Sequence, residues 1–222
     1  MSVHERSSVS VVSLALEASS SSRSLTDQFE IVKLPIFWAF AMANVCIGAG
    51  HITSSLFIPK VAHGRLGVET RLSGLLMTVV GGTGIVSRLL VGWMADKESV
   101  EPLYLYALGP LGSIVCCALY PFVPAYWAMA LTVAAHAFFM ALYSSPFTVC
   151  CLEVFGLDKL NFGFGMMMFF IGVGAIVCPP VIGYLFDLFG QDFVKTMACV
   201  GLAYGGAFIW MIVTIKFQKK KQ

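Results

Sequence analysis

The feature that most constrains the fold is a series of six apolar runs, each long enough to cross a lipid bilayer. A transmembrane helix needs about 20 mainly apolar residues, because the hydrocarbon core is about 30 Å thick. The runs cover residues 34–58, 73–95, 103–122, 126–152, 163–186 and 194–217. Hydrophobic residues make up 58% of the chain and charged residues 12%, unlike an ordinary soluble domain. We therefore expect an all-α membrane protein with six transmembrane helices.

Short connections separate these runs and contain most of the charges and the helix-ending residues. They cover residues 59–71, 96–102, 121–124, 153–161 and 187–192. Neighbouring helices joined by such short segments should run antiparallel. We predict three regions, namely a disordered, serine-rich cytosolic tail over residues 1–33, a helix bundle over 34–217 and a basic cytosolic tail over 218–222.

The distribution of Lys and Arg predicts the orientation, because cytoplasmic segments near the spans are enriched in both residues. Six spans place both ends of the chain on one side. That side carries nine basic residues, namely Arg6, Arg23, Lys33, Lys97, Lys159, Lys216, Lys219, Lys220 and Lys221. The other side carries four, namely Lys60, Arg65, Arg71 and Lys195. This imbalance predicts cytosolic termini, and the basic C-terminal tail predicts contact with anionic membrane lipids.

Arg88 is the most informative single residue, because it lies in the middle of the second apolar run. No acidic residue lies within that run. A bare cation in hydrocarbon costs at least about 2.5 kcal/mol on insertion scales, so it is expected to face the bundle interior or a water-filled cavity. Arg88 therefore indicates a binding site for an anion.

Other polar residues recur at helical spacing and predict stripes along three helices. The first stripe contains Asn44, Gly48, His51 and Ser55, the second contains His136, Met140, Ser144 and Thr148, and the third contains Gly84, Arg88 and Gly92. Three such stripes can surround an aqueous cavity, which is where transporters hold their binding site. The alternative is that these residues only form hydrogen bonds that hold the helices together.

Several kinds of function are not indicated. The seven cysteines lack metal-ligand or redox spacing, so we interpret them as small apolar residues and expect no metal site. The glycine clusters at 81–84 and 163–174 do not follow a strand, so we assign them to helix packing and flexing rather than to nucleotide binding. Paired carboxylates and a nucleophile arrangement are missing, so we expect a protein that is not an enzyme, without a cofactor or a nucleic-acid partner.

Two segments, residues 88–96 and residues 179–190, resemble motifs of the monocarboxylate transporter family of the major facilitator superfamily. Residues 88–96, RLLVGWMAD, resemble the motif after the eighth helix of major facilitator transporters and include Gly92 and Asp96. Residues 179–190, PPVIGYLFDLFG, resemble the eleventh-helix motif of the monocarboxylate transporters. In this second segment, Pro179, Pro180, Gly183 and Asp187 match the motif, and we expect them to have a structural role. Residues 57–67 and the segment from Ser144 to Glu153 follow the same family order.

The resemblance implies that the bundle corresponds to helices seven to twelve, the C-terminal half of a twelve-helix transporter. Such proteins bind substrate between two six-helix halves and work by alternating access. Arg88 matches the family arginine that pairs with the substrate carboxylate, and Ser144 is a matched contact. Asn44, His51 and Met140 are the other expected substrate-binding residues. Gly84 stands where proton-coupled members have an aspartate, so the coupling stays open.

Two functional hypotheses follow from these observations. The first is a plasma-membrane secondary transporter, such as a symporter, for monocarboxylates or related small organic acids. The second is a non-transporting half, as a truncated or splice product, that pairs with or modulates a full-length relative, because the family's helices one to six and first-helix lysine have no counterpart here. The resemblance also suggests a single-span immunoglobulin-domain chaperone as a partner.

Overall fold

The computed structural model describes residues 30–95 and 101–221, and every regular element in those ranges is helical. The short 3-10 helices are η1 (Glu30–Lys33), η2 (Tyr120–Phe122) and η3 (Leu157–Lys159). The α-helices are α2 (Pro35–Leu66), α3 (Thr70–Ala95), α4 (Pro102–Leu119), α5 (Tyr126–Ser144), α6 (Phe147–Phe155), α7 (Leu160–Leu188) and α8 (Phe193–Lys221).

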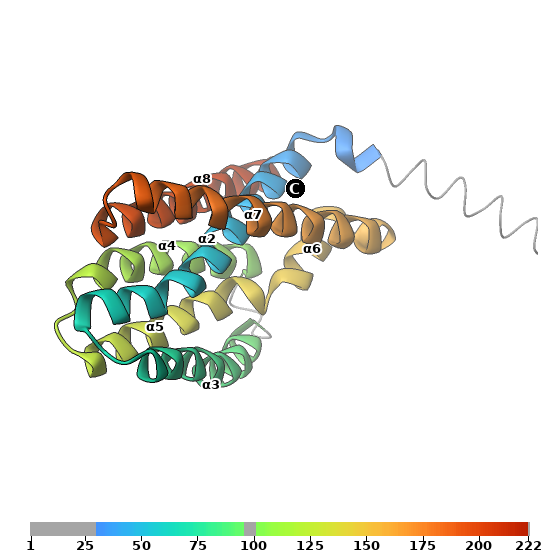
Figure 1. The fold of residues 1–222 in the computed structure, drawn as a ribbon. Helices are drawn as coiled ribbons and strands as arrows, with labels where there is room; N and C mark the ends of the chain where they lie inside the picture. Colours follow the sequence, from blue (N-terminus) through green and yellow to red (C-terminus); the bar gives the residue numbers. More distant parts are fainter. Residues whose placement is uncertain (1–29, 96–100, 222) are drawn as a thin grey trace, which may run out of the picture.

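Six of the helical segments are long and apolar enough to cross a membrane, as the sequence predicts. They are Pro35–Leu66, Thr70–Ala95, Pro102–Phe122, Tyr126–Phe155, Leu157–Leu188 and Phe193–Lys220. The predicted all-α architecture with six spans is therefore confirmed. The described part of the chain begins and finishes at the same end of the bundle (Figure 1), as an even number of antiparallel spans requires.

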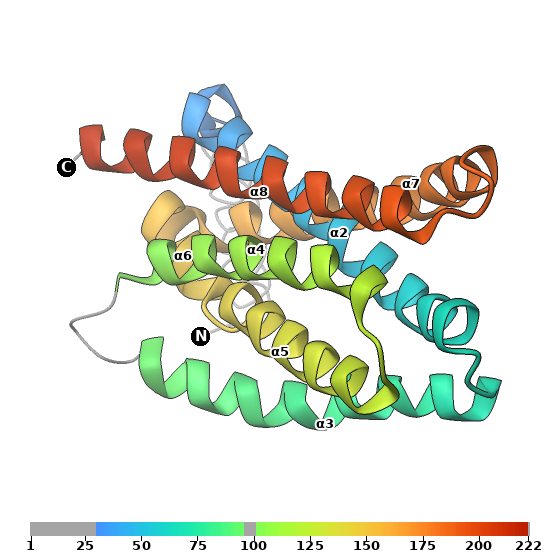
Figure 2. The same ribbon diagram turned by 90° about the vertical axis from the view of Figure 1, so that its left-hand side faces the viewer.

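The helices pack in layers (Figures 1 and 2). Helices α7 and α8 lie along one side, α3 lies along the opposite side, and α2, α4 and α5 lie between them. Helix α2 packs mainly against α7 and α8, while α4 packs against α5 and α8. Helix α3 contacts mainly α5. Because α2 is central and α3 peripheral, residues on their facing sides can enclose a site beside α5.

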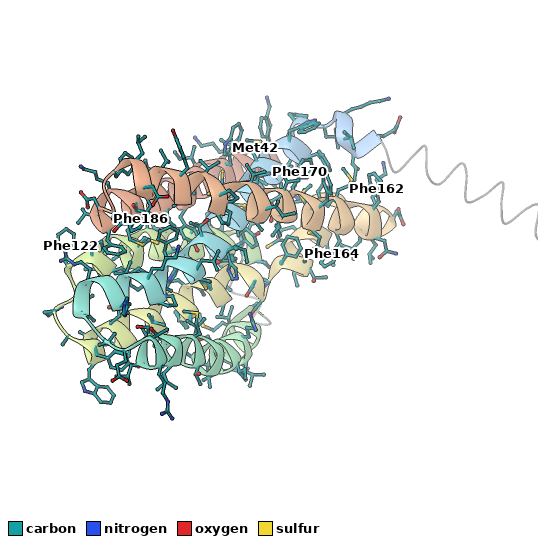
Figure 3. All side chains as sticks on the ribbon, viewed as in Figure 1. Met42, Phe122, Phe162, Phe164, Phe170 and Phe186 are labelled. Carbon is teal, nitrogen blue, oxygen red and sulfur yellow. The ribbon has the colours of Figure 1, made fainter. Side chains whose placement is uncertain are left out.

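Phenylalanines along α7 fasten this helix to its neighbours (Figure 3). The ring of Phe170 lies 6.1 Å from that of Phe37, and the ring of Phe186 lies 5.6 Å from that of Phe57. Edge-to-face pairs at such distances add about 0.5–1.5 kcal/mol beyond the area they bury. These contacts hold α7 against both ends of α2.

Small residues let α2 and α7 approach closely at their crossing. A Cβ atom on Gly48 would collide with the backbone carbonyl of Ile171, and one on Gly174 would collide with the carbonyl of Val45. Membrane helices associate through such small residues because lipid supplies little hydrophobic drive for their association. The predicted packing role holds for Gly174, and also for Gly163, whose added Cβ would collide with the ring of Phe155.

The other glycines of those two clusters have open space around them in this bundle. An added Cβ would meet no heavy atom outside its own helix segment within 4 Å at Gly81, Gly82, Gly84, Gly165 and Gly172. The packing part of the sequence-based assignment is therefore not met at these positions within the described contacts, and the flexing part stays a prediction.

The structure also corrects several predicted helix ends. Helix α2 continues through Pro59 to Leu66, where a connection was expected, and ends at Gly67, whose φ of 63° closes the helix through a bond to the His63 carbonyl. The fourth run divides into α5 and α6 around Pro146, because proline has no N–H to continue the hydrogen-bond pattern.

The predicted tails differ from the structure where the two overlap. Residues Glu30–Lys33 form η1, although the sequence predicted disorder up to residue 33. Helix α8 continues to Lys221, through most of the predicted basic tail. The rest of the predicted N-terminal tail, residues 1–29, lies outside the described ranges.

Candidate functional site

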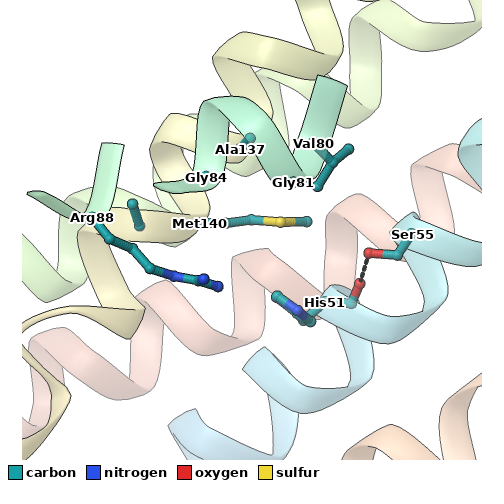
Figure 4. A pocket seen from close by; sticks show the side chains of 9 residues that line it. His51, Ser55, Val80, Gly81, Gly84, Arg88, Ala137 and Met140 are labelled. Carbon is teal, nitrogen blue, oxygen red and sulfur yellow. Dashed lines mark hydrogen bonds between the residues drawn. The ribbon is translucent and has the colours of Figure 1, made fainter. Parts of the chain in front are cut away.

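Arg88 lies on α3 beside a cavity of about 110 Å³. The cavity is lined by His51 and Ser55 of α2, by Val80, Gly81, Gly84 and Arg88 of α3, and by Ala137, Met140 and Ala141 of α5. Figure 4 shows the Arg88 and His51 side chains pointing toward one another into this space, with Met140 beside them. Arg88, His51 and Met140, which the sequence predicts as site residues on three helices, therefore line one cavity.

The local sequence of α3 explains why this side of the helix is open. Gly81, Gly84 and Arg88 are spaced by three and four residues, which places them on one helix face. The two glycines carry no side chain, and the space next to them is not filled by a neighbouring element. The long Arg88 side chain can therefore reach along its own helix toward α2.

The charge of Arg88 is not balanced by a carboxylate among the described residues. The ion pair found within these ranges joins Lys195 and Asp192, whose atoms lie 3.4 Å apart, and neither residue lines the cavity. A guanidinium has five N–H donors and stays charged at any pH relevant to proteins. The site thus combines a permanent cation, hydrogen-bond donors and space for a small anion.

His51 connects this cavity to a second one. Its Nδ1 atom lies 2.8 Å from the Tyr143 hydroxyl, and this bond orients the imidazole ring. The second cavity measures about 220 Å³. Its lining residues are Ile47, Gly48, His51, Ile52, Tyr106, Tyr143, Ser144, Phe147, Met168, Ile171 and Ala175. Ser144, another predicted site residue, therefore lines the second cavity rather than the one beside Arg88.

Asn44 lies behind the wall of this second cavity. It is fully buried, its Nδ2 atom donates to the Phe40 carbonyl at 2.8 Å, and its Oδ1 atom accepts from the Tyr106 hydroxyl at 2.8 Å. Both ends of the Asn44 amide are thus bonded to protein groups. In this structure Asn44 orients Tyr106, which lines the cavity, instead of reaching the cavity itself.

The second predicted polar stripe does not stay on one face. His136 is buried in the core, where its Nδ1 atom lies 2.8 Å from the Tyr120 hydroxyl, while Thr148 is exposed. An α-helix has 3.6 residues per turn, so residues spaced by four rotate by about 40° at each step. From His136 to Ser144 this drift amounts to about 80°, and Thr148 lies on α6, beyond the break at Pro146.

The residues Gly92, Pro179, Pro180, Gly183 and Asp187, which belong to the two motif-like segments, are not among the residues that line these cavities. Pro179 and Pro180 lie within α7, and Asp187 lies near the end of that helix, where its carbonyl accepts from the Gly190 N–H at 3.1 Å. A Cβ at Gly92 or Gly183 would meet open space. Asp96 lies outside the described ranges.

Most of the residues that form the second cavity were not found by sequence reasoning. Tyr106, Tyr143, Phe147, Met168 and Ile171 are apolar or aromatic residues within apolar runs. Such residues give the same pattern whether they face lipid, the core or a ligand. Only the spatial arrangement of α2, α4, α5, α6 and α7 distinguishes them.

Comparison with known proteins identifies the family. The model of the MFS_1 like family matches residues 63–222, so this chain belongs to that family. Monocarboxylate transporter 9 of Mus musculus is 30% identical over 71% of this chain and 31% of its own length. Monocarboxylate transporter 12 of Mus musculus is 22% identical over 90% of this chain and 41% of its own length.

A solved structure has a fold similar to that of this chain. The outward conformation of the major facilitator superfamily transporter FucP matches 87% of this chain and 45% of its own chain with a TM-score of 0.69 and 15% identity. The chain therefore has the fold of part of a major facilitator transporter and is a multi-pass membrane protein. It spans between 31% and 41% of the length of the two relatives named above, which are transporters rather than enzymes.

Proposed function

We propose that this chain forms the anion-binding half of a secondary transporter for monocarboxylates or related small organic acids. The observation that carries this proposal is the geometry of Arg88, a permanent cation on an apolar span that points into a cavity with His51. No described carboxylate pairs with Arg88, so a substrate carboxylate is the partner that this charge lacks.

An arginine suits this role because its planar guanidinium can hold a carboxylate through two parallel hydrogen bonds. Charge-assisted bonds of this kind are strong and directional, so they orient the substrate as well as attract it. In a major facilitator fold the site would open alternately to the two sides of the membrane as one half moves against the other. The names of the relatives support a carboxylate substrate.

We further propose that His51 couples anion binding to proton binding. Arg88 and His51 are the ionisable residues among the side chains that line the first cavity. A protonated imidazole would repel the guanidinium, and a bound carboxylate would offset that repulsion. The anion and the proton would therefore bind together, which is the basis of symport, even though Gly84 provides no carboxylate.

The proposed location is the plasma membrane, with both ends of the bundle facing the cytosol. The excess of Lys and Arg on the side of the termini supports this orientation. The described chain begins and finishes at one end of the bundle, so both of its ends lie on the same side of the membrane.

Substitution of Arg88 tests the anion site. In cells that express the chain at matched surface levels, we expect Arg88→Ala to reduce uptake of labelled lactate or pyruvate at least about tenfold, because a lost charged hydrogen-bonding pair typically costs about 2–5 kcal/mol. Arg88→Lys should retain part of the uptake, since it keeps the charge and loses the paired geometry. Arg71→Ala, at the exposed start of the same helix, is the matched control. Unchanged uptake in Arg88→Ala would contradict the proposal.

A second function is favoured by the surface of α3 and α7. In the most apolar 18-residue stretch of each of these two spans, only 17% of the residues are buried. The corresponding share for the span that contains α2 is 67%. Each of these helices thus presents apolar side chains that lipid or another six-helix unit could cover. A non-transporting half that pairs with a full-length relative predicts no uptake by the chain alone and co-purification with that relative. The same pull-down would reveal an immunoglobulin-domain chaperone.

A further inference from the structure

We infer that the anion bound by this chain carries an apolar group about the size of a branched aliphatic chain or a phenyl ring, and that this group occupies the second cavity. The inference rests on the proposed function, because it takes Arg88 as the carboxylate site. It defines which small organic acids fit and which residues select them.

The two cavities form neighbouring parts of one site because His51 lines both. One side of the imidazole faces the space beside Arg88, and the Tyr143 bond holds the ring between α2 and α5. A ligand whose carboxylate lies at Arg88 can therefore extend past His51. The first cavity, at about 110 Å³, has half the volume of the second, at about 220 Å³, so the small charged end of the ligand fits the first and the bulkier end fits the second.

The volume of the second cavity fits an apolar group as large as a branched aliphatic chain or a phenyl ring. It measures about 220 Å³, and an engineered apolar cavity of about 150 Å³ in another protein binds benzene. A phenyl ring or a branched chain of four or five carbons is therefore within its capacity. Ile47, Ile52, Phe147, Met168 and Ile171 supply most of an apolar wall.

The polar atoms in this wall are largely bonded to other protein groups. The Tyr106 hydroxyl donates to Asn44 at 2.8 Å, and the Tyr143 hydroxyl lies 2.8 Å from His51. Ser144 is the remaining side chain with a hydroxyl in the lining. A hydroxylated or charged tail would lose its hydration here with few partners to replace it, which opposes binding. An apolar tail loses nothing of this kind and gains from leaving water.

The wall is held in place by contacts between protein groups. Phe147 packs against Tyr106 with ring centroids 6.3 Å apart, and the close approach at Gly48 fixes the α2 and α7 backbones on either side. An apolar pocket whose walls are fixed by such packing selects ligands by size, because the walls do not collapse onto a short ligand.

The inference is tested by measuring the affinity of the purified chain for a series of carboxylates. We expect affinity to rise by about three- to fourfold for each methylene from acetate to hexanoate, as burial of a CH₂ group predicts. We expect 3-phenylpropanoate to bind tightly, and 6-aminohexanoate to bind at least about tenfold more weakly than hexanoate because its ammonium group would be desolvated. Loss of binding in Arg88→Ala identifies the site in each case.

Two variants locate the apolar group. Ala175→Leu should fill the second cavity and abolish the gain with chain length. Ala135→Leu, an identical change at an exposed position of α5, should leave the series as in the parent chain. If Ala175→Leu does not fold, Ile52→Asn at a position that is 37% exposed provides the same test by making the wall polar.

The outcomes separate this inference from the function on which it rests. Arg88-dependent binding that does not vary with chain length, or a chain-length gain that survives Ala175→Leu and Ile52→Asn, overturns the apolar subsite and leaves the anion site standing. Absence of binding for every carboxylate overturns the anion site and the subsite together.

Discussion

Asn44 shows how a single buried polar residue can shape a site that it does not touch. Its amide connects the α2 backbone at Phe40 to the Tyr106 hydroxyl on α4, and both Asn44 and Tyr106 are almost completely buried. Tyr106 in turn lines the larger cavity. A buried polar group is tolerated only when its hydrogen bonds are satisfied, so the pair fixes both side chains.

We predict a coupled effect on stability when this pair is changed. Asn44→Leu leaves the Tyr106 hydroxyl unpaired and should destabilise the chain by about 1–3 kcal/mol. Tyr106→Phe leaves the Asn44 carbonyl unpaired and should also destabilise it. The double variant should lose clearly less than the sum, because both polar groups are then gone. Thermal unfolding of the purified variants in detergent measures this coupling, and strictly additive losses would refute it.

At the scale of helices, the contact between α2 and α7 brings His51 and the apolar lining residues of α7 to one site. Gly48 and Gly174 allow this contact because each lies against the backbone of the other helix. The sequence analysis assigned Gly174 to helix packing, and the close approach of the Val45 carbonyl agrees with that role. The α3 glycines have the same appearance in the sequence but face open space, because what lies opposite a glycine depends on the arrangement of helices.

We expect a glycine that faces another backbone and a glycine that faces open space to respond oppositely to substitution by alanine. Gly174→Ala should destabilise the bundle by about 1–3 kcal/mol, the usual cost of overpacking, because its Cβ would meet the Val45 carbonyl. Gly205→Ala on α8, where an added Cβ meets nothing within 4 Å, should be neutral or slightly stabilising because alanine favours helix more than glycine does. Thermal unfolding distinguishes the two, and equal responses would argue against the α2–α7 contact.

At the scale of the whole molecule, an even number of spans places the two ends of the described chain together (Figure 1). The turn between α7 and α8, which includes Gly190 and Gln191, lies at the opposite end of α8. The orientation of the bundle in the membrane therefore decides at once which of these parts faces the cytosol.

Epitope accessibility tests the proposed orientation. We expect an epitope inserted in the turn at residues 190–191 to bind antibody on intact cells, and epitopes on either terminus to bind only after permeabilisation, because the termini carry the larger share of Lys and Arg. An antibody against a cytosolic protein controls for leaky cells. Labelling of the terminal epitopes on intact cells would reverse the orientation.

The sequence alone was sufficient to predict six spans, and its resemblance to known motifs predicted a major facilitator architecture. It also singled out Arg88, which lines a cavity in the structure, and the anion site there stays a prediction. The spans and the choice of Arg88 depend on local properties, since the length of an apolar run and an unpaired charge within it have the same physical consequence in any bundle. The tertiary structure decided that Asn44 bonds to Tyr106, that His136 is in the core and that Ser144 lines a second cavity. Helical rotation and the choice of neighbouring helix set those outcomes, and neither is encoded in the spacing of one segment.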